Sequence, residues 1–478
     1  MKKILKYTGL LISIIMLTVS VVFIALLINV RVVPVKYCII AAVVLVILTA
    51  VTAFTQKWFV PGIITKIIAI IMIVVLIMGS IYLNQTRHMI NKITTTQEEK
   101  IVMGVYVLND GGYDSVDMLN NKSIGIGTAV DRESTDELIK KMGAGGFMAE
   151  YPEYSNIREL ADALLQGQID AAIMKTSSIE MIDEMGDFTG FASDVKLIYS
   201  GEFTIKVATT EENVTDNYLS SDDVINVYIS GIDSRGGINE VSRSDVNIIM
   251  SINKKTHNIL MINTPRDYYV PLSISNGVRD KLTHAGVYGI ECSRNTLEML
   301  YGIQIDYYVK VNFSGFEKII DSLGGVDVTL DYSATLSQAG NLTVHNGVNH
   351  FNGEQALAFA RERYAYSDGD RQRGRNQMMI MEAAIKKACS PAIISNYTSV
   401  LSEVSKNVIT DMSYDFIADL AQTQLNDMAA WNITQISVTG VGSYSSTTYS
   451  MPGWSLYIMV PDEESVENAR EQIRDNYN

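Results

Sequence analysis

The first 92 residues of this 478-residue chain contain no aspartate or glutamate, although they carry nine lysines and arginines. The other 386 residues carry 29 basic and 53 acidic groups, which gives them a net charge of −24. Each of three largely apolar runs in the first part is about long enough for a helix that crosses ~30 Å of hydrocarbon. The first run is too long for a cleaved signal peptide, and two more follow it. We therefore expect three transmembrane helices within residues 1–92, at Tyr7–Val30, Tyr37–Phe54 and Val60–Leu83.

Positive charges at the ends of these runs give a weak signal for orientation. With the N-terminus in the cytoplasm, five would lie inside and four outside, and the difference rests mostly on the N-terminal lysines. We adopt this orientation because the motifs below require it. It predicts a multi-pass protein of the cell membrane whose large C-terminal region is extracytoplasmic. The inside group would be Lys2, Lys3, Lys6, Lys57 and Lys66, and the outside group Arg31, Lys36, Arg87 and Lys92.

Cysteine is scarce as well. Cys38 lies in the second apolar run, whereas Cys292 and Cys389 lie in the acidic part. A disulfide between the last two is one reading. Two buried thiols are the other reading, and this is the more frequent situation for lone cysteines.

Residues 98–216 alternate short β-rich runs with helical patterns, which predicts a small α/β accessory domain. Its last two strands are expected at Val195–Ser200 and Phe203–Ala208. The stretch Leu160–Met174 resembles one lobe of a periplasmic-type solute-binding fold. The segment contains no histidine or cysteine, and its acids are scattered. Docking or substrate guidance is ranked first for it, ahead of small-molecule sensing, and an inert spacer remains open.

Turn-forming residues at Asn217–Asp223 predict a linker, after which a second α/β pattern occupies residues 224–478. Its most unusual segment is Arg361–Gln377, which holds five arginines in seventeen residues. Guanidinium groups offer planar donors that match phosphate oxygens, so converging arginines indicate a polyphosphate or pyrophosphate site. A solvated basic helix face would instead pair its arginines with glutamates at helical spacing. The only acids in the segment are Glu362, Asp368 and Asp370.

Four motifs in fixed order carry a family resemblance. They are V-Y-I-S-G-I-D-S-R (Val227–Arg235), S-R-S-D (Ser242–Asp245), N-T-P-R-D (Asn263–Asp267) and R-E-R…G-D-x-x-R-x-x-x-Q (Arg361–Gln377). With these motifs the chain resembles the LytR-CpsA-Psr family, in particular its capsule-locus members, from Val224 to beyond the last arginine helix. Many members have an R-x-x-R-Q order at the end of the last motif. Here Arg375 precedes Asn376, so the resemblance does not extend to Arg375.

The resemblance implies an α-β-α sandwich with a mixed central sheet over residues 224–478. It also implies an extracytoplasmic phosphotransferase that moves a capsular polysaccharide from a polyprenyl (undecaprenyl) pyrophosphate carrier onto peptidoglycan. Its partners would be the membrane, this lipid-linked polysaccharide, the peptidoglycan acceptor and other capsule-assembly proteins. Transfer requires neutralisation of the pyrophosphate charge while an acceptor hydroxyl attacks phosphorus.

The same resemblance assigns pyrophosphate binding to a set of arginines and one glutamine. Arg361 and Arg363 would face one side of an extended segment, and Arg373 and Gln377 share a helix face near an anion-favouring N-terminus. Arg371 and Arg375 share another face and are expected to be exposed or to contact polymer. A salt bridge to Asp267 is the alternative role for Arg266. The assigned set is Arg243, Arg266, Arg361, Arg363, Arg373 and Gln377.

Asp233 and Asp245 would meet at one end of the sheet, where they would bind Mg²⁺ together with substrate phosphates. Alternatives are a turn role for Asp233 and an ion pair with Arg243 for Asp245. Arg266 and Asp370 are the catalytic candidates, and Asp370 would act as the general base. Neighbouring arginines would lower its pKa, which leaves a positioning role open, and Asp368 is the less favoured substitute.

Two other functions remain open. The first is a polyprenyl-pyrophosphate hydrolase with water as the acceptor. The second is an envelope sensor or regulator of capsule synthesis, although the predicted cytoplasmic segments are too short for an output domain. The net negative charge opposes nucleic-acid binding. The methionine-rich stretch Met378–Ile385 is expected to be core rather than a lipid groove, and the C-terminal stretch is expected to add no separate site.

Overall fold

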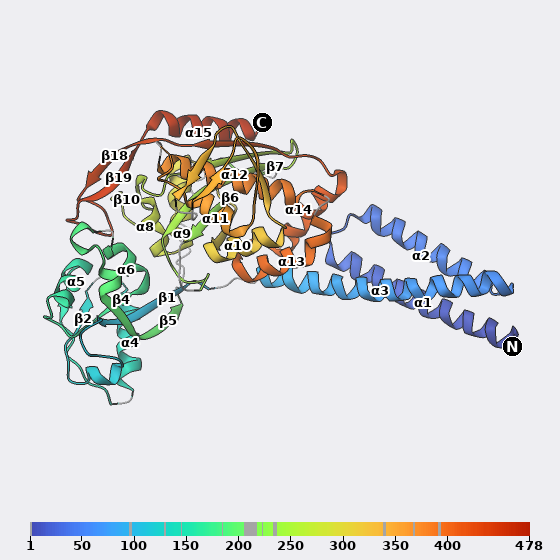
Figure 1. Ribbon diagram of the computed structural model, residues 1–478, viewed down its shortest axis with the longest axis horizontal. Coiled ribbons are helices and arrows are strands. Elements are labelled where there is room, and N and C mark those ends of the chain that lie inside the picture. The colour runs from blue at the N-terminus through green and yellow to red at the C-terminus, as the bar shows by residue number, and fades with distance from the viewer. Residues whose placement is uncertain are drawn as a thin grey trace.

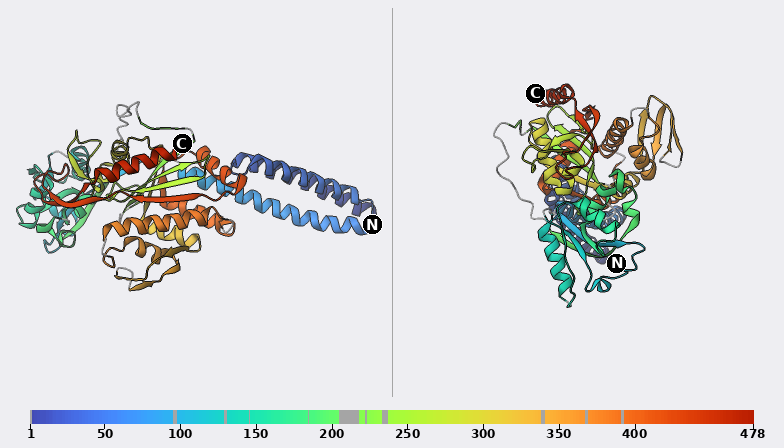
Figure 2. Two further views of the ribbon diagram at one scale, coloured as in Figure 1. Left: turned by 90° about the horizontal axis from the view of Figure 1, so that it is seen from above. Right: turned by 90° about the vertical axis from the view of Figure 1, so that its left-hand side faces the viewer.

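The computed structural model describes residues 2–94, 98–128, 131–144, 146–183, 185–204, 218–221, 223–232, 237–337, 341–366, 369–390 and 393–478. Three parts follow one another along its longest axis (Figure 1). A bundle of long helices lies at one end, a small α/β domain lies at the other, and a larger α/β domain lies between them. A second view from above gives the same order (Figure 2).

The N-terminal bundle consists of three helices that are long and apolar enough to cross a membrane, as the sequence predicted. Most of their large aliphatic side chains point outward, which suits a lipid environment better than water. Contacts with the larger domain occur at one end of the bundle, where Arg31 forms a 2.9 Å ion pair with Asp415. The Tyr414 hydroxyl also donates to the Val30 carbonyl at 2.7 Å. The helices are α1 (Lys2–Val30), α2 (Val35–Thr55) and α3 (Phe59–Thr94).

The accessory domain is a five-stranded sheet in the order β3-β2-β4-β1-β5. Strand β2 is parallel to β3 and β4, whereas β1 is antiparallel to β4 and β5. The elements are β1 (Lys100–Leu108), β2 (Ile124–Gly127), α4 (Arg132–Gly143), β3 (Glu153–Tyr154), α5 (Ile157–Leu165), β4 (Ala171–Lys175), α6 (Thr176–Asp183), α7 (Phe191–Asp194) and β5 (Val195–Thr204).

The expectation of two separate strands at the end of this domain was wrong. Strand β5 runs without interruption through Gly201, which pairs with Met103 of β1. Pairing along the whole length of β1 keeps the strand continuous across the boundary between the two expected runs. The predicted end of the second run, residues 205–208, lies outside the described residues.

The larger domain is built on a six-stranded mixed sheet in the order β16-β11-β6-β7-β8-β17. Strands β6, β7 and β8 are mutually antiparallel, while β11 is parallel to β6 and β17 is parallel to β8. The strands are β6 (Val224–Ile232), β7 (Ser244–Asn253), β8 (Asn258–Asn263), β11 (Tyr307–Asn312), β16 (Val408–Thr410) and β17 (Asn432–Ser437).

Helices cover both faces of this sheet, because its central strands are apolar on both sides. In β6, Tyr228 packs with helices on one face, while Val227 and Ile229 pack on the other. The α-β-α sandwich that was predicted is therefore confirmed. The first face holds α8 (Leu282–Ala285), α9 (Ile290–Tyr301) and α15 (Glu463–Asn476), and the other side of the domain holds α10 (Phe313–Ser322), α11 (Gly353–Arg361), α12 (Asp370–Ala388), α13 (Ile393–Asn407) and α14 (Tyr414–Asp427).

Four small antiparallel strand pairs or ribbons extend from this core. The β18–β19 ribbon reaches toward the accessory domain (Figure 1). The strands are β9 (Tyr269–Pro271) with β10 (Arg279–Lys281), β12 (Val326–Leu330) with β15 (Gly347–Phe351), β13 (Ala334–Leu336) with β14 (Leu342–Val344), and β18 (Gly440–Ser445) with β19 (Leu456–Pro461).

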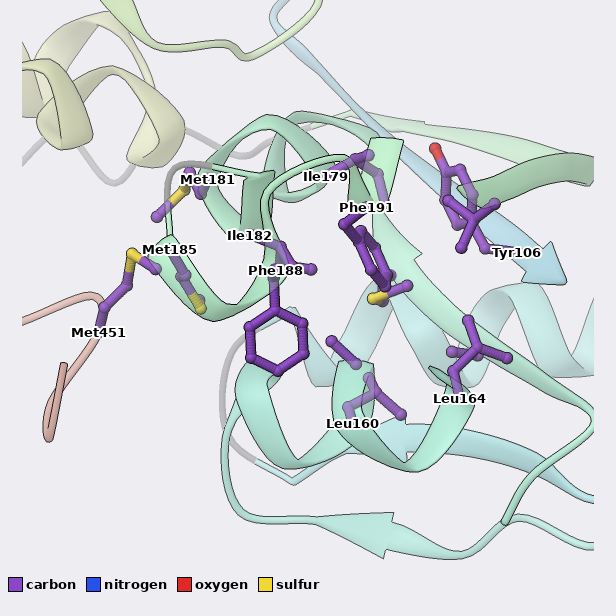
Figure 3. Close-up of a cluster of buried hydrophobic side chains, with 14 of the residues drawn as sticks. Tyr106, Leu160, Leu164, Ile179, Met181, Ile182, Met185, Phe188, Phe191 and Met451 are labelled. Carbon is purple, nitrogen blue, oxygen red and sulfur yellow. The ribbon is translucent and has the colours of Figure 1, made fainter. Parts of the chain in front are cut away.

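The two α/β domains share one hydrophobic core. Met451, from the loop that joins β18 to β19, packs beside Met181 and Met185 of the accessory domain (Figure 3). Trp454 of the same loop lies edge-on against Phe188, with ring centroids 5.8 Å apart. Such shared burial holds the accessory domain in place more firmly than a flexible linker would.

A buried ion pair reinforces this attachment. Glu99, just before β1, accepts a 2.7 Å hydrogen bond from Lys310 of β11 and a 2.8 Å bond from the backbone N–H of Ile290. Lys310 also donates to the Glu240 carbonyl at 2.9 Å. Both charged side chains are almost completely buried, so each depends on the other for charge compensation.

We predict that Lys310→Met lowers the free energy of unfolding by about 3–5 kcal/mol, because it leaves the Glu99 carboxylate buried and uncompensated. The double variant Glu99→Gln/Lys310→Met should recover much of this loss, since glutamine still offers an oxygen to the Ile290 N–H. Chemical unfolding of the detergent-solubilised chain, followed by tryptophan fluorescence, measures both. A double variant as unstable as the single one would contradict this account.

Candidate functional site

Most of the assigned residues that the structure describes lie at one end of the six-stranded sheet. Strands β6, β8 and β11 finish at this end and β7 begins there, so Asp245 and Arg266 are neighbours although 21 residues separate them. Helix α11 ends in this region at Arg361, and the first turns of α12 bring Arg373 and Gln377 to it. Loop residues at strand ends can project into such a site while the sheet fixes their positions.

Asp245 and Arg266 form the central ion pair. Nη1 of Arg266 lies 3.1 Å from Oδ1 of Asp245, and each side chain is 13% exposed. The Thr283 hydroxyl donates to the same oxygen at 3.3 Å. The alternative partner Asp267 lies farther from Arg266, at 3.7 Å, and forms a 2.8 Å ion pair with Lys281. Of these two described acids, Asp245 is therefore the nearer partner of Arg266.

Three arginines act on the titration of Asp245. Burial alone would raise the pKa of this carboxyl, but the charges of Arg266, Arg243 and Arg373 outweigh burial and hold the pKa below its ordinary value. Asp245 is therefore an anion at neutral pH. The same interaction places Arg243 and Arg373 close to Asp245, so three arginines act on this carboxylate at one end of the sheet.

Arg243 has a partner that sequence reasoning missed. Its Nη2 lies 3.0 Å from Oε2 of Glu180, in helix α6 of the accessory domain. No local sequence signal could have identified Glu180, because the contact depends on how α6 is placed against the start of β7. The accessory domain therefore touches the candidate site directly.

Glu362 organises the loop that carries Arg363. Its fully buried carboxylate accepts backbone N–H bonds from Arg363 at 3.0 Å, Tyr364 at 2.8 Å and Ala365 at 3.1 Å. The helix α11 ends at Arg361, and Glu362 itself is extended. Sequence reasoning counted Glu362 only as an acid within the arginine run. A carboxylate between two arginines, directly after a helix, was the available signal.

Helix α12 separates its arginines by face. Arg373 is only 6% exposed, whereas Arg371 is exposed and Arg375 is half-buried and bonded to Gln372. Gln377 lies one turn beyond Arg373 and donates to the Ala360 carbonyl at 3.4 Å. A side chain at Gly374 would overlap Asn263 at the end of β8, so glycine allows close packing of α12 at this point.

An apolar cavity opens beside the arginines. It encloses about 500 Å³, open solvent included, and Arg361 and Gln377 belong to its lining. The Arg361 guanidinium lies 4.8 Å from the centre of the Phe313 ring. Met381 also lines the cavity, whereas its neighbours Met378 and Ile380 are core residues, so the methionine-rich stretch divides between the two roles. The other walls come from Ile229, Gly231, Val246, Val311, Asn312, Phe316, Leu357 and Ala360.

Three aspartates considered for the site are not described, or are described only in part. Asp233 and Asp368 lie outside the described residues, and only the backbone of Asp370 is described, at the start of α12. Among the described residues, no group of three or more histidine, cysteine or acidic side chains could hold a metal ion. Cys292 and Cys389 are free thiols, so the disulfide reading was wrong; Cys292 packs in a small core with Leu272 and Ala285.

Together these features define an α/β protein with three apolar N-terminal helices and a cluster of arginines around the Asp245 carboxylate at one end of a mixed sheet. The chain belongs to the LytR-CpsA-Psr family: the family model LytR_cpsA_psr matches residues 196–469. The resemblance noted from the four motifs is thereby confirmed.

The chain is similar to several proteins that are named as teichoic acid transferases. The polyisoprenyl-teichoic acid–peptidoglycan teichoic acid transferase TagU of Bacillus cereus is 34% identical over 197 residues, which is 40% of this chain and 62% of the relative. The protein of the same name from Halalkalibacterium halodurans is 33% identical over 247 residues, which is 52% of this chain and 77% of that protein. The solved structure of TagV from B. subtilis covers 54% of this chain and 98% of its own, with 27% identity and a TM-score of 0.45. The chain thus spans about three-fifths of the length of the B. cereus relative.

The lowered pKa of Asp245 predicts a pH-dependent contribution to stability. A depressed native pKa means that the ionised carboxylate stabilises the fold above about pH 4, and that this contribution is lost as the pH falls through the native pKa. Asp245→Asn should therefore be less stable than the parent at pH 7, with a smaller difference at pH 3. Unfolding curves at both pH values measure it. Asp114→Asn, at an exposed carboxylate, is the control, and a pH-independent difference for Asp245→Asn would refute the prediction.

Proposed function

We propose that this chain is a membrane-anchored phosphotransferase that binds a polyprenyl-pyrophosphate-linked glycopolymer and transfers the polymer to peptidoglycan. The observation that carries the proposal is the contact between the apolar cavity and the arginine cluster. Arg361 and Gln377 belong to both, so one site offers an apolar environment and cationic donors side by side. A polyprenyl pyrophosphate has the matching construction, because an uncharged hydrocarbon chain is joined directly to a diphosphate.

The cationic side of the site supports binding of the diphosphate. Arg266 and Arg373 are mostly buried and lie near the Asp245 carboxylate, where the low dielectric strengthens their interaction with an anion. Arg243, Arg361 and Arg363 complete the proposed set. Fixed cations of this kind stabilise the charge that develops on phosphoryl oxygens during transfer, at little reorganisation cost.

The proposed reaction is attack by a peptidoglycan hydroxyl on the phosphorus nearest the sugar. A phosphodiester forms between acceptor and polymer, the bond to the bridging oxygen breaks, and polyprenyl phosphate leaves with the electron pair. The arginines neutralise both phosphates, and Asp370 is proposed to receive or orient the hydroxyl proton. Asp245 is ionised, and Mg²⁺ uses one or two carboxylates together with substrate oxygens and water, so Asp245 is its first proposed ligand. Bound Mg²⁺ would supply further charge neutralisation, with Asp233 as its second proposed ligand.

The orientation and the polymer belong to the same proposal. Lipid-linked glycopolymers and peptidoglycan meet at the outer face of the membrane, so the larger domain is placed outside the cell. We propose a capsular polysaccharide as cargo, on the resemblance of the three apolar helices and the accessory domain to capsule-locus proteins. The names of the relatives favour a teichoic acid as the other candidate.

Arg266→Ala and Arg373→Ala should each reduce transfer by about a hundredfold or more, because each removes a cation from the reacting phosphates. Arg371→Ala, at an exposed arginine of the same helix, is the matched control and should retain activity. The purified full chain is incubated with lipid-pyrophosphate glycan, Mg²⁺ and peptidoglycan, and the phosphodiester-linked product is quantified. Release of free sugar phosphate without that product would replace the transferase with a hydrolase.

Removal of Mg²⁺ by a chelator should reduce transfer by at least tenfold, and added Mg²⁺ should restore it. Asp245→Asn should weaken Mg²⁺ binding and so shift the half-maximal Mg²⁺ concentration upward, because the variant lacks the ionised ligand. Unchanged activity after chelation would remove Asp233 and Asp245 from the metal assignment while leaving the arginine site in place.

A further inference from the structure

A second cavity lies between the accessory domain and the larger domain, away from the arginine cluster. It encloses about 1170 Å³, open solvent included. Its walls come from β2, the starts of α4 and α5, β4 and α6 on one side, and from Val287, Tyr288 and the loop after β18 on the other. Ligand sites commonly form at such domain boundaries. Tyr449, Ser450 and Pro452 line this space, and they come from the C-terminal stretch that was expected to add no separate site.

We propose that this interdomain cavity is a saccharide-binding site for a glycan strand of the transfer reaction. The proposal rests on the function proposed above and assigns a role to the accessory domain. Three features support it: a charge-balanced lining, a combination of hydroxyl groups with tyrosine rings, and a position distant from the membrane helices.

The charges in the lining cancel each other. Lys175 is 6% exposed, and its ammonium group lies 3.3 Å from the carboxylate of Asp131 and donates to the Val287 carbonyl at 2.7 Å. No other ionisable side chain besides tyrosine appears among the described lining residues. A site for phosphate or another polyanion would need surplus cations, such as those around Asp245. The cavity therefore suits an uncharged ligand.

The rest of the polar lining offers hydroxyls and an amide, which can both donate and accept hydrogen bonds. Tyr288 and Tyr449 lie with ring centroids 5.7 Å apart, and Tyr449 is 37% exposed. Tyrosine presents an apolar face and a polar end, and a sugar ring has the same combination of C–H faces and hydroxyls. The further polar lining residues are Thr128, Thr135, Tyr154, Ser155, Asn156, Ser178 and Ser450.

The location favours a glycan over a lipid. The accessory domain lies at the opposite end of the molecule from α1, α2 and α3 in two perpendicular views (Figures 1 and 2). A lipid tail in the bilayer cannot reach that end, whereas a glycan strand in the cell wall can. Helix α6 connects the cavity to the candidate active site, because Ser178 and Met181 line the cavity while Glu180 pairs with Arg243. A bound glycan would thus lie one helix away from the arginine cluster.

The test is calorimetric titration of the full chain in lipid nanodiscs. One arm uses chitotetraose as a neutral probe of the peptidoglycan backbone, and the other uses the oligosaccharide released by mild acid from the lipid-linked glycopolymer. Binding of chitotetraose assigns the cavity to the acceptor strand, and binding of the released oligosaccharide assigns it to the donor polymer. The proposal is overturned if neither saccharide binds. It is also overturned if inorganic phosphate displaces the bound saccharide from the interdomain cavity.

Two variants locate the binding. Ser178→Trp places a large side chain in the cavity, and Tyr449→Ala removes the exposed aromatic face; each should weaken binding about tenfold or more. Tyr444→Ala is the control, since Tyr444 is 71% exposed on β18 and does not line the cavity. Unweakened binding in both cavity variants, with unchanged melting temperatures, contradicts the site. Arg266→Ala should keep saccharide binding while it loses transfer, so failure of the transferase proposal and failure of this one give different results.

Discussion

The requirement to hold several arginines at one end of a sheet constrains the larger domain more than any other interaction. Guanidinium groups in partly buried positions repel one another unless anions compensate their charge. The Asp245 carboxylate interacts with three of these arginines and compensates part of it. The Asp245–Arg266 pair uses the antiparallel pairing of β7 and β8, which brings residues on two strands together. Glu362 performs a different task, because its carboxylate binds backbone N–H groups and so fixes the loop of Arg363. Asp245 thus compensates the charge of the arginines, whereas Glu362 fixes the backbone conformation of a loop.

The second constraint is the two-residue periodicity of the central strands. Alternate residues of β6 face opposite helical layers, so Ile229 and Gly231 both face the α10–α12 side. There they line the apolar cavity together with Phe313, Phe316 and Met381. The same strand ends at the arginine-rich edge. The apolar cavity and the arginine cluster are therefore neighbours, because the cavity lies against β6 and the arginines lie around the end of the sheet at which β6 finishes.

Local patterns predicted much of this. The three apolar helices followed from hydropathy, and the difference between buried Arg373 and exposed Arg371 follows from helical spacing. What was missed depends on contacts between distant segments. The continuity of β5 through Gly201 was missed because its pairing with β1 is invisible locally, and Glu180 gave no sign of its contact with Arg243. The interdomain cavity is the extreme case, since its lining extends from Met103 to Pro452, which lie 349 residues apart in the sequence.

The attachment of the accessory domain gives the candidate site its second set of contacts. A flexible tether would allow this domain to sample many positions, but a shared hydrophobic core and the buried Glu99–Lys310 pair hold it in one. In that position Arg243 forms an ion pair with Glu180 and also interacts electrostatically with Asp245. Any displacement of α6 must change the environment of Arg243, because ion pairs between partly buried groups weaken steeply when their geometry is lost. A ligand between the domains would therefore act on the arginine cluster through the Glu180–Arg243 contact, without a rearrangement of the sheet.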